Sequence, residues 1–192
     1  MILLSLVLMF VLHYAGSLGA SNSKISDSQM SAQQAAIVHP SIHGYSYYGA
    51  SGHQIRLVNN LSAINPTYKQ MVDFLKTDQT DKIHYNNSNF ICGDFAEQLH
   101  NNAERAGYKC AFVSVYFFDG GYGHACNAFN TADKGLVYVD CTGSTDPSSA
   151  PTWDSIVAQP FGIGEPYRTV RFDLCYSFCS SMGVIKNYRI YW

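Results

Sequence analysis

Residues 109–141 read KCAFVSVYFFDGGYGHACNAFNTADKGLVYVDC, and this stretch decides the fold class. Its β-branched and aromatic residues fall into strand-like runs at 109–118, 124–130 and 136–141. The segments between these runs, DGG at 119–121 and TADKG at 131–135, have the composition of turns. We therefore predict consecutive antiparallel strands joined by short connections.

Helices are expected before these strands. Asn65-Pro66-Thr67 opens the first helix, which ends near Thr77. The second covers 91–106, where apolar residues recur at steps of three and four, with Asn89 as N-cap and Gly107 as left-handed terminator. Helices followed by a meander of strands indicate an α+β domain, with the second helix packed on an antiparallel sheet. His100 on that helix is expected to be exposed.

The region after the strands is less regular. Prolines and polar residues make 142–167 a long connection, with one short helix expected around 153–157. Strands are predicted at 168–174 and 184–192, where β-formers are again concentrated. These strands would complete the sheet.

The N-terminal residues indicate export. Residues 2–12 are almost continuously apolar and small residues follow, so 1–20 is typical of a signal peptide, although no Lys or Arg precedes the apolar run. An uncleaved N-terminal anchor is the alternative, and it would be the protein's only contact with a membrane. Residues 21–52 have the composition of a tail, and 53–192 that of one folded domain. We expect a secreted or cell-surface protein.

Composition excludes several classes of function. Lys and Arg number 12 against 14 Asp and Glu, and no basic run suggests nucleic-acid binding. The cysteines and histidines lack the spacing of zinc ligands, so no metal is predicted, and no cofactor motif is present.

All 6 cysteines lie beyond residue 91, and in an exported protein they would form disulfides. The disulfide candidates, whose pairing the sequence leaves open, are Cys110, Cys141, Cys175 and Cys179. Two N-glycosylation sequons are present, and Asn60 is favoured over Asn86 because a glycan at Asn86 would crowd the site described next.

Cys92 falls in the first turn of the predicted helix at 91–106. Unpaired N–H groups and the helix dipole favour an anion there, so a thiolate would be stabilised. The N–H of Cys92 also points where the oxyanion of a tetrahedral intermediate would form. A disulfide cysteine that happens to begin a helix is the alternative interpretation.

Strand alternation places a histidine and an aspartate together. Side chains two apart share a face, and those on one face of 124–130 are His124, Cys126 and Ala128. Those on one face of the next strand are Leu136, Tyr138 and Asp140. If Ala128 lies opposite Leu136, then Cys126 faces Tyr138 and His124 faces Asp140, with Cβ atoms about 4.5–5.5 Å apart. The helix that carries Cys92 would pack on this face and complete a triad.

These residues resemble the transglutaminase-like superfamily, whose papain-like core has a cysteine at a helix start and then histidine and aspartate on adjacent strands. The matching stretches are FICGDFA at 90–96, GHA at 123–125 and LVYVDCT at 136–142, preceded by DKIHY at 81–85. The resemblance covers roughly residues 65–168. It implies Cys92 as nucleophile, His124 as general base and acid, and Asp140 as the orienting carboxylate.

The resemblance implies acyl transfer at amide bonds of a protein or peptide substrate, either by a cysteine protease or amidase or by a transglutaminase. The second oxyanion donor would lie upstream of Cys92, at Asn89 or Tyr85, and Cys126 would be a structural thiol or a resolving partner for Cys92. The alternative is a catalytically silent extracellular structural or adhesive module, in which Cys92 lies in a disulfide.

Overall fold

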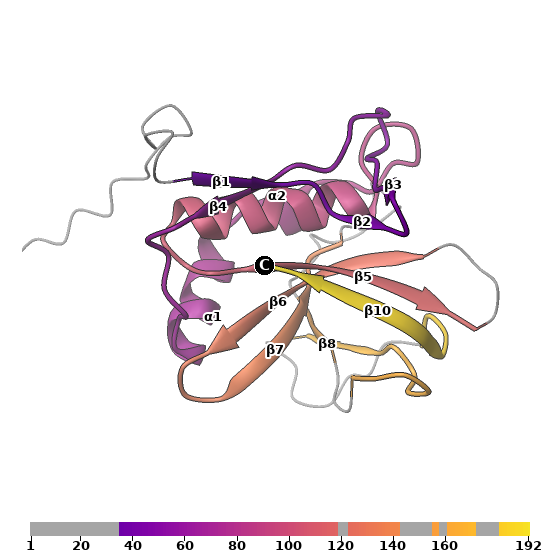
Figure 1. Ribbon diagram of the computed structural model, residues 1–192. Coiled ribbons are helices and arrows are strands. Elements are labelled where there is room, and N and C mark those ends of the chain that lie inside the picture. Colours follow the sequence, from indigo (N-terminus) through magenta and orange to yellow (C-terminus); the bar gives the residue numbers. More distant parts are fainter. Residues whose placement is uncertain (1–34, 119–122, 143–154, 158–160, 172–180) are drawn as a thin grey trace, which may run out of the picture.

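The computed structural model of the protein describes residues 35–118, 123–142, 155–157, 161–171 and 181–192. The helices are α1 (Tyr68–Thr77), the short 3-10 helix η2 (Thr80–Lys82) and α2 (Cys92–Arg105). The strands are β1 (Ala35–Val38), β2 (Ser41–Ile42), β3 (Tyr45–Ser46), β4 (Leu57–Asn60), β5 (Ala111–Phe117), β6 (His124–Thr131), β7 (Gly135–Asp140), β8 (Ser155–Val157), β9 (Thr169–Arg171) and β10 (Ile185–Tyr191). The α+β class is confirmed (Figure 1).

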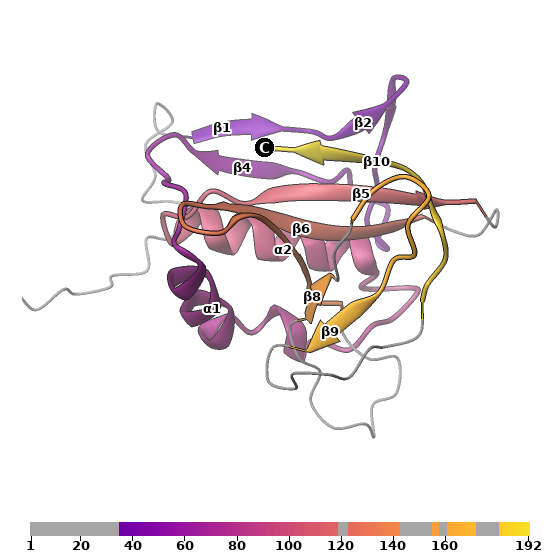
Figure 2. The same ribbon diagram turned by 90° about the horizontal axis from the view of Figure 1, so that it is seen from below.

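Within the described ranges the strands form one large sheet and two small ones. The large sheet has six strands in the order β10-β5-β6-β7-β8-β9, and every neighbouring pair is antiparallel. Helix α2 lies along this sheet and contacts β6 and β5 (Figures 1 and 2). The small β1–β4 sheet lies beside α2, which contacts β4.

Helix α1 begins with a capping box. The Thr67 hydroxyl accepts the N–H of Gln70, while the Gln70 side chain accepts the N–H of Thr67 at 2.8 Å. Met71 and Leu75, one turn apart, are buried in the core that the helix shares with the large sheet. The predicted end at Thr77 is confirmed.

Helix α2 follows the predicted range of 91–106 closely, and Gly107 ends it with the left-handed φ of +88°. The predicted N-cap, Asn89, is wrong. Ile91 takes that position, and the Asp94 carboxylate accepts its N–H at 2.8 Å. The helix is therefore capped by a side chain from its own first turn.

The β6–β7 hairpin differs from the prediction by two residues of register. Ala128 lies opposite Tyr138 and not opposite Leu136. The turn is centred one residue later than expected, because Thr131 pairs with Gly135, which supplies a left-handed φ of +70°. Since the difference is an even number of residues, every side chain keeps its predicted face.

The two faces of the large sheet belong to separate cores. The face against α2 contributes Phe112, Ala125, Phe129, Val137 and Val139. The opposite face contributes Val113, Val115, Cys126, Ala128 and Tyr138, joined there by Val157, Tyr167 and Ile185. His124 alternates with Ala125, so its strand position belongs to the second face. The expectation that α2 packs on the face of His124 is therefore wrong for the body of the helix.

Backbone hydrogen bonds draw the two edges of the sheet together. Residues 164–167, just before β9, pair with residues 182–185 at the start of β10. The Tyr167 N–H donates to the Gly183 carbonyl at 2.9 Å, and the Met182 N–H donates to the Tyr167 carbonyl at 3.0 Å. The sheet thus curls around its second core, and this closing segment inserts Tyr167 into that core.

Residues 35–52, which the sequence assigns to a tail, lie against the domain. Strand β1 pairs with β4, and the Tyr47 ring lies 6.0 Å from the Phe112 ring of β5 between centroids. Strands β1 to β4 are only 2 to 4 residues long, too short for an alternating pattern to predict.

Predictions for the last third of the chain hold in part. The strand predicted at 184–192 is confirmed as β10, and the one at 168–174 is confirmed over 169–171 as β9, its remainder lying outside the described residues. The helix expected around 153–157 is wrong at 155–157, which form β8.

His100 is buried, and the expectation of exposure is wrong. Its side chain is 0% exposed, and Nε2 lies 2.9 Å from Asn59 Oδ1. Strand β4 covers this side of α2, so the helix is enclosed by the large sheet and by β4. Burial lowers the pKa of His100 to about 4, although a backbone hydrogen bond at Cys110 opposes the shift.

Acidification is therefore expected to destabilise the fold through His100. The unfolded chain takes up this proton near pH 6.5 and the folded protein only near pH 4, so stability is lost as pH falls through that window. Each unit of pKa corresponds to about 1.4 kcal/mol, so the loss is on the order of 3 kcal/mol. When both proteins are unfolded in urea, the free energy of unfolding should depend less on pH in His100→Asn than in wild type. Exposed His84→Gln is the control, and equal slopes in wild type and His100→Asn would contradict the prediction.

Candidate active site

Cys92 begins helix α2 as a half-buried free thiol. It packs against the core that contains Ala96 of the same helix and Ala125 of β6. The first N–H groups of a helix have no partner within it, and together with the helix dipole they favour negative charge nearby. The environment of Cys92 therefore suits a thiolate.

The structure brings His124 and Asp140 together. His124 Nε2 lies 2.7 Å from Asp140 Oδ2, and the two residues are 6% and 7% exposed. They lie diagonally across the β6–β7 pair and not directly opposite, because of the two-residue difference in register. The hydrogen bond still forms because both side chains keep the same face.

Cys92 lies near enough to His124 to act on its charge, although α2 as a whole packs on the far face of the sheet. Asp140 occupies Nε2 of the imidazole, and Cys92 is the next residue whose interaction raises the pKa of His124. Burial alone would lower the pKa of His124, but the charge and hydrogen bond of Asp140, followed by Cys92, raise it to about 10. The Asp140 carboxylate, helped by the nearby Cys92, therefore favours the imidazolium form of His124.

Both oxygens of Asp140 are engaged. Oδ1 accepts the N–H of Thr142 at 3.0 Å, while Oδ2 accepts from His124 and from the Tyr167 hydroxyl, each at 2.7 Å. Burial alone would raise the pKa of the Asp140 carboxyl, but His124, Thr142 and Tyr167 hold it well below its usual value. Asp140 is therefore a fixed, ionised carboxylate.

Tyr167 is a member of this network that sequence reasoning missed. Its side chain is 0% exposed, and its ring stands edge-on to His124 with centroids 5.2 Å apart. Burial, and then the charge of Asp140, raise the pKa of Tyr167, so the phenol stays protonated and donates. No local pattern marks Tyr167, because the closing of the sheet brings it to Asp140.

Cys126 lies beside the network as a buried free thiol. Burial, and then the charge of Asp140, raise its pKa well above that of an ordinary thiol, although a hydrogen bond with Tyr167 opposes the shift. Cys126 is therefore a neutral thiol, which fits a structural role better than a nucleophilic one.

Of the two predicted oxyanion donors, Tyr85 is the one on which the charge of Cys92 acts. Burial raises the pKa of Tyr85, and the charges of Cys92 and Asp94 add to the effect. Its ring stacks on Phe95 at 6.3 Å between centroids, beneath the start of α2. Asn89 is exposed in the preceding turn. Tyr85 is therefore the candidate with an electrostatic link to Cys92.

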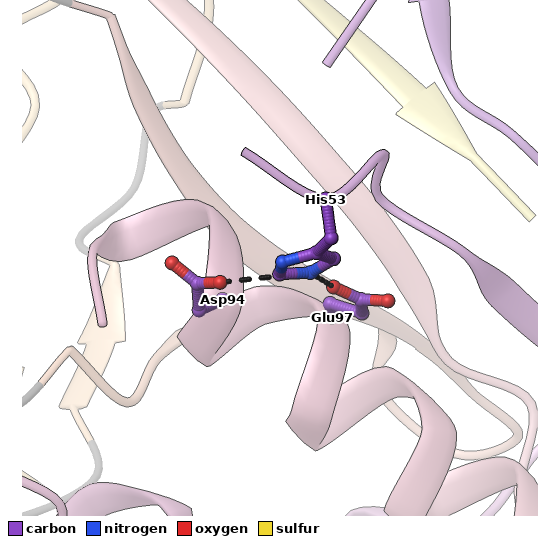
Figure 3. Close-up of side chains that lie close together, drawn as sticks. All are labelled: His53, Asp94 and Glu97. Carbon is purple, nitrogen blue, oxygen red and sulfur yellow. Dashed lines mark hydrogen bonds and ion pairs between the residues drawn. The ribbon is translucent and has the colours of Figure 1, made fainter. Parts of the chain in front are cut away.

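A second polar cluster lies on the outer side of α2 (Figure 3). His53 Nε2 lies 2.8 Å from Glu97 Oε2 and 3.6 Å from Asp94 Oδ1. Asp94 also accepts the N–H groups of Ala50 and Ile91, each within 2.9 Å. The cluster therefore ties the loop before β4 to the first turns of α2.

His53, Asp94 and Glu97 could offer metal ligands, since one ligand atom from each lies within 4.8 Å of the others. They already bind one another and backbone N–H groups, however, which gives this cluster a sufficient structural role. They also line a pocket of about 380 Å³ along the outer face of α2. Cys92 is not among its lining residues, although its close neighbours Phe90 and Asp94 are.

The remaining predicted sites are disposed as follows. Cys110 is a buried free thiol, and Cys141 Sγ lies 3.7 Å from the Phe95 carbonyl oxygen. Cys175 and Cys179 lie outside the described residues. Asn60 Nδ2 donates to the Glu104 carbonyl at 3.2 Å, so a glycan there would disturb this bond.

Comparisons with protein-family models, with curated proteins and with solved structures find no match for this chain. Within the part of the chain that the structure describes, no helix has the length and apolarity needed to span a membrane.

Proposed function

We propose that the protein is an exported thiol acyltransferase that acts on amide bonds of peptides or proteins through Cys92, His124 and Asp140. One observation carries the proposal: the buried His124 imidazole is hydrogen-bonded through Nε2 to Asp140, and Cys92 at the start of α2 lies near enough to contribute to its raised pKa. This is the arrangement that a thiolate–imidazolium pair requires. The order of these residues, cysteine on a helix and then histidine and aspartate on neighbouring strands, also supports a transglutaminase-like core.

The residues have defined roles in the proposed reaction. The Cys92 thiolate attacks the amide carbonyl carbon, and the developing oxyanion is stabilised by the Cys92 N–H, with Tyr85 as the second donor. His124 gives its proton to the departing amine as the C–N bond breaks, which leaves a thioester on Cys92. Water or a primary amine then attacks the thioester and passes its proton to His124, so that an acid or a new amide is released.

Two outcomes for the thioester define two subclasses, a cysteine protease or amidase and a transglutaminase. Hydrolysis is favoured for an isolated small domain of this type, by analogy with the resembled superfamily. The alternative of a silent structural module requires Cys92 to lie in a disulfide. The free thiol at Cys92 supports the catalytic proposal over that alternative.

Native, non-reduced protein is expected to react with iodoacetamide selectively at Cys92, and faster at pH 6 than a cysteine in an unstructured peptide. The buried thiols Cys110 and Cys126 should react only after unfolding. Peptide mapping by mass spectrometry across a pH series measures both rates.

Cys92→Ser is the control, since it should remove the fast label while the melting temperature stays within a few degrees of wild type. Alkylation of Cys92 no faster at pH 6 than that of a cysteine in an unstructured peptide would overturn the proposal. If labelling succeeds, release of amine from peptide amides and incorporation of a fluorescent primary amine into protein would distinguish hydrolysis from amine transfer.

A further inference from the structure

Tyr167 has the most constrained hydroxyl in the candidate active site. It donates to Asp140 Oδ2 at 2.7 Å, the same oxygen that accepts from His124. A phenol has a single proton, and a carboxylate can only accept, so that proton is committed to Asp140.

The result is a chain of hydrogen bonds that ends on the imidazole. It links the Tyr167 hydroxyl to His124 through Asp140 Oδ2, which accepts a hydrogen bond from each of them. Together with the Thr142 N–H on Oδ1, the donors fix the carboxylate plane. A carboxylate held in this way cannot rotate away from His124 without leaving a buried donor unsatisfied.

We propose that Tyr167 is a positioning residue for the thiol chemistry of Cys92, acting through Asp140 on His124. The inference rests on the proposed function, because it concerns the same nucleophile. Tyr167 does not touch the reacting atoms. It fixes the orientation of the Asp140 carboxylate, and thereby the imidazolium that stabilises the Cys92 thiolate.

The fold holds Tyr167 from three directions. Its N–H and carbonyl pair with Gly183 and Met182, and its ring lies 6.0 Å from Phe117 and 6.2 Å from Phe161 between centroids. A Cβ on Gly183, whose φ is +146°, would come within 3.0 Å of the Phe117 ring. The position of the hydroxyl therefore depends on a close approach of the segment that closes the sheet.

The direct test is Tyr167→Phe, which removes one oxygen and keeps the ring. The readout is the rate of Cys92 alkylation by iodoacetamide between pH 5 and pH 9, which needs no knowledge of the substrate. Loss of a hydrogen bond to a charged group should lower the alkylation rate below pH 7 by about tenfold. The acid limb, which is the low-pH part of the pH–rate profile, should shift to higher pH by up to about one unit. Tyr138→Phe is the matched control, since Tyr138 is a buried tyrosine of the same core that stacks on Phe161.

A double-mutant cycle separates positioning from packing. If Tyr167 acts through Asp140, then Tyr167→Phe should have no further effect on the rate in an Asp140→Asn background. Equal additional losses in both backgrounds would overturn the inference. Gly183→Ala displaces Tyr167 from outside the site and should shift the acid limb in the same direction.

The two proposals fail in different ways. Ordinary thiol reactivity of Cys92 in the wild-type protein would end the proposed function. A reactive Cys92 whose pH profile is unchanged in Tyr167→Phe would leave that function standing and reject the role of Tyr167.

Discussion

Asp140→Asn is expected to lower the rate of Cys92 alkylation at pH 6 by about a hundredfold. Without the carboxylate only the smaller contribution of Cys92 opposes the burial that lowers the pKa of His124, so the imidazole loses its proton at lower pH and Cys92 becomes an ordinary thiol. Such a thiol is less than about 1% ionised at pH 6, and the greater nucleophilicity of its thiolate recovers only part of the loss. Turnover of any amide substrate should fall further, by about 10³- to 10⁴-fold.

The pH range over which the pair contributes to stability follows from the directions of its pKa shifts. The folded pKa of Asp140 is lowered, so its contribution is present above the ordinary carboxyl pKa and lost as pH falls below it. The folded pKa of His124 is raised to about 10, so its contribution is full below pH 6.5 and lost as pH rises toward 10. Turnover that needs the imidazolium should decline near the same upper limit, and at lower pH in Asp140→Asn.

Asp73→Asn is the control, because it removes an exposed carboxylate paired only with Lys69 on the surface of α1. The melting temperature of Asp140→Asn must be measured alongside, since breaking a buried pair costs about 3–5 kcal/mol. A folded Asp140→Asn protein that alkylates like wild type at pH 6 would refute the triad.

Phe95→Ala is expected to destabilise the fold by about 4 kcal/mol, the range for truncating a fully buried aromatic side chain. Phe95 is 0% exposed in the first turn of α2, where its ring meets Phe90 edge-on at 4.7 Å and stacks on Tyr85 at 6.3 Å between centroids. The variant therefore creates a cavity directly beneath the residues that surround Cys92. The alkylation of Cys92 should also become less selective.

Equilibrium unfolding in urea measures the effect of Phe95→Ala. Phe118→Ala provides the control, because Phe118 is 57% exposed and its truncation should change stability by less than about 0.5 kcal/mol. A loss below 1 kcal/mol at Phe95 would show that the packing under α2 is not as described.

Local patterns of residue types in the sequence predicted the helices and strands on which the candidate site depends. The spacing of apolar residues predicted α1 and α2, and β-rich runs predicted β5, β6, β7 and β10. The proximity of His124 and Asp140 could be predicted although the register was wrong, because a two-residue difference preserves the face. The face of the sheet on which α2 packs could not be predicted, because strand alternation does not show which side of a sheet a helix covers.

Other features depend on contacts between distant segments. His100 looked exposed because the sequence does not reveal that β4 covers α2. Strand β8 is too short to show a pattern. Tyr167 reaches Asp140 only because residues 164–167 pair with 182–185, and no sequence motif near Tyr167 predicts that pairing.

The pairing that closes the sheet also bears on the order in which parts of the protein fold. Helix α2 and the β6–β7 hairpin are local structures that can form early, whereas the closing segment needs residues 182–185 and the long-range pairing of β10 with β5. On our proposals, the nucleophile therefore gains its reactivity last. A chain still emerging from the ribosome, or misfolded at β10, is expected to carry an ordinary thiol and to leave neighbouring proteins unmodified until its folding is complete.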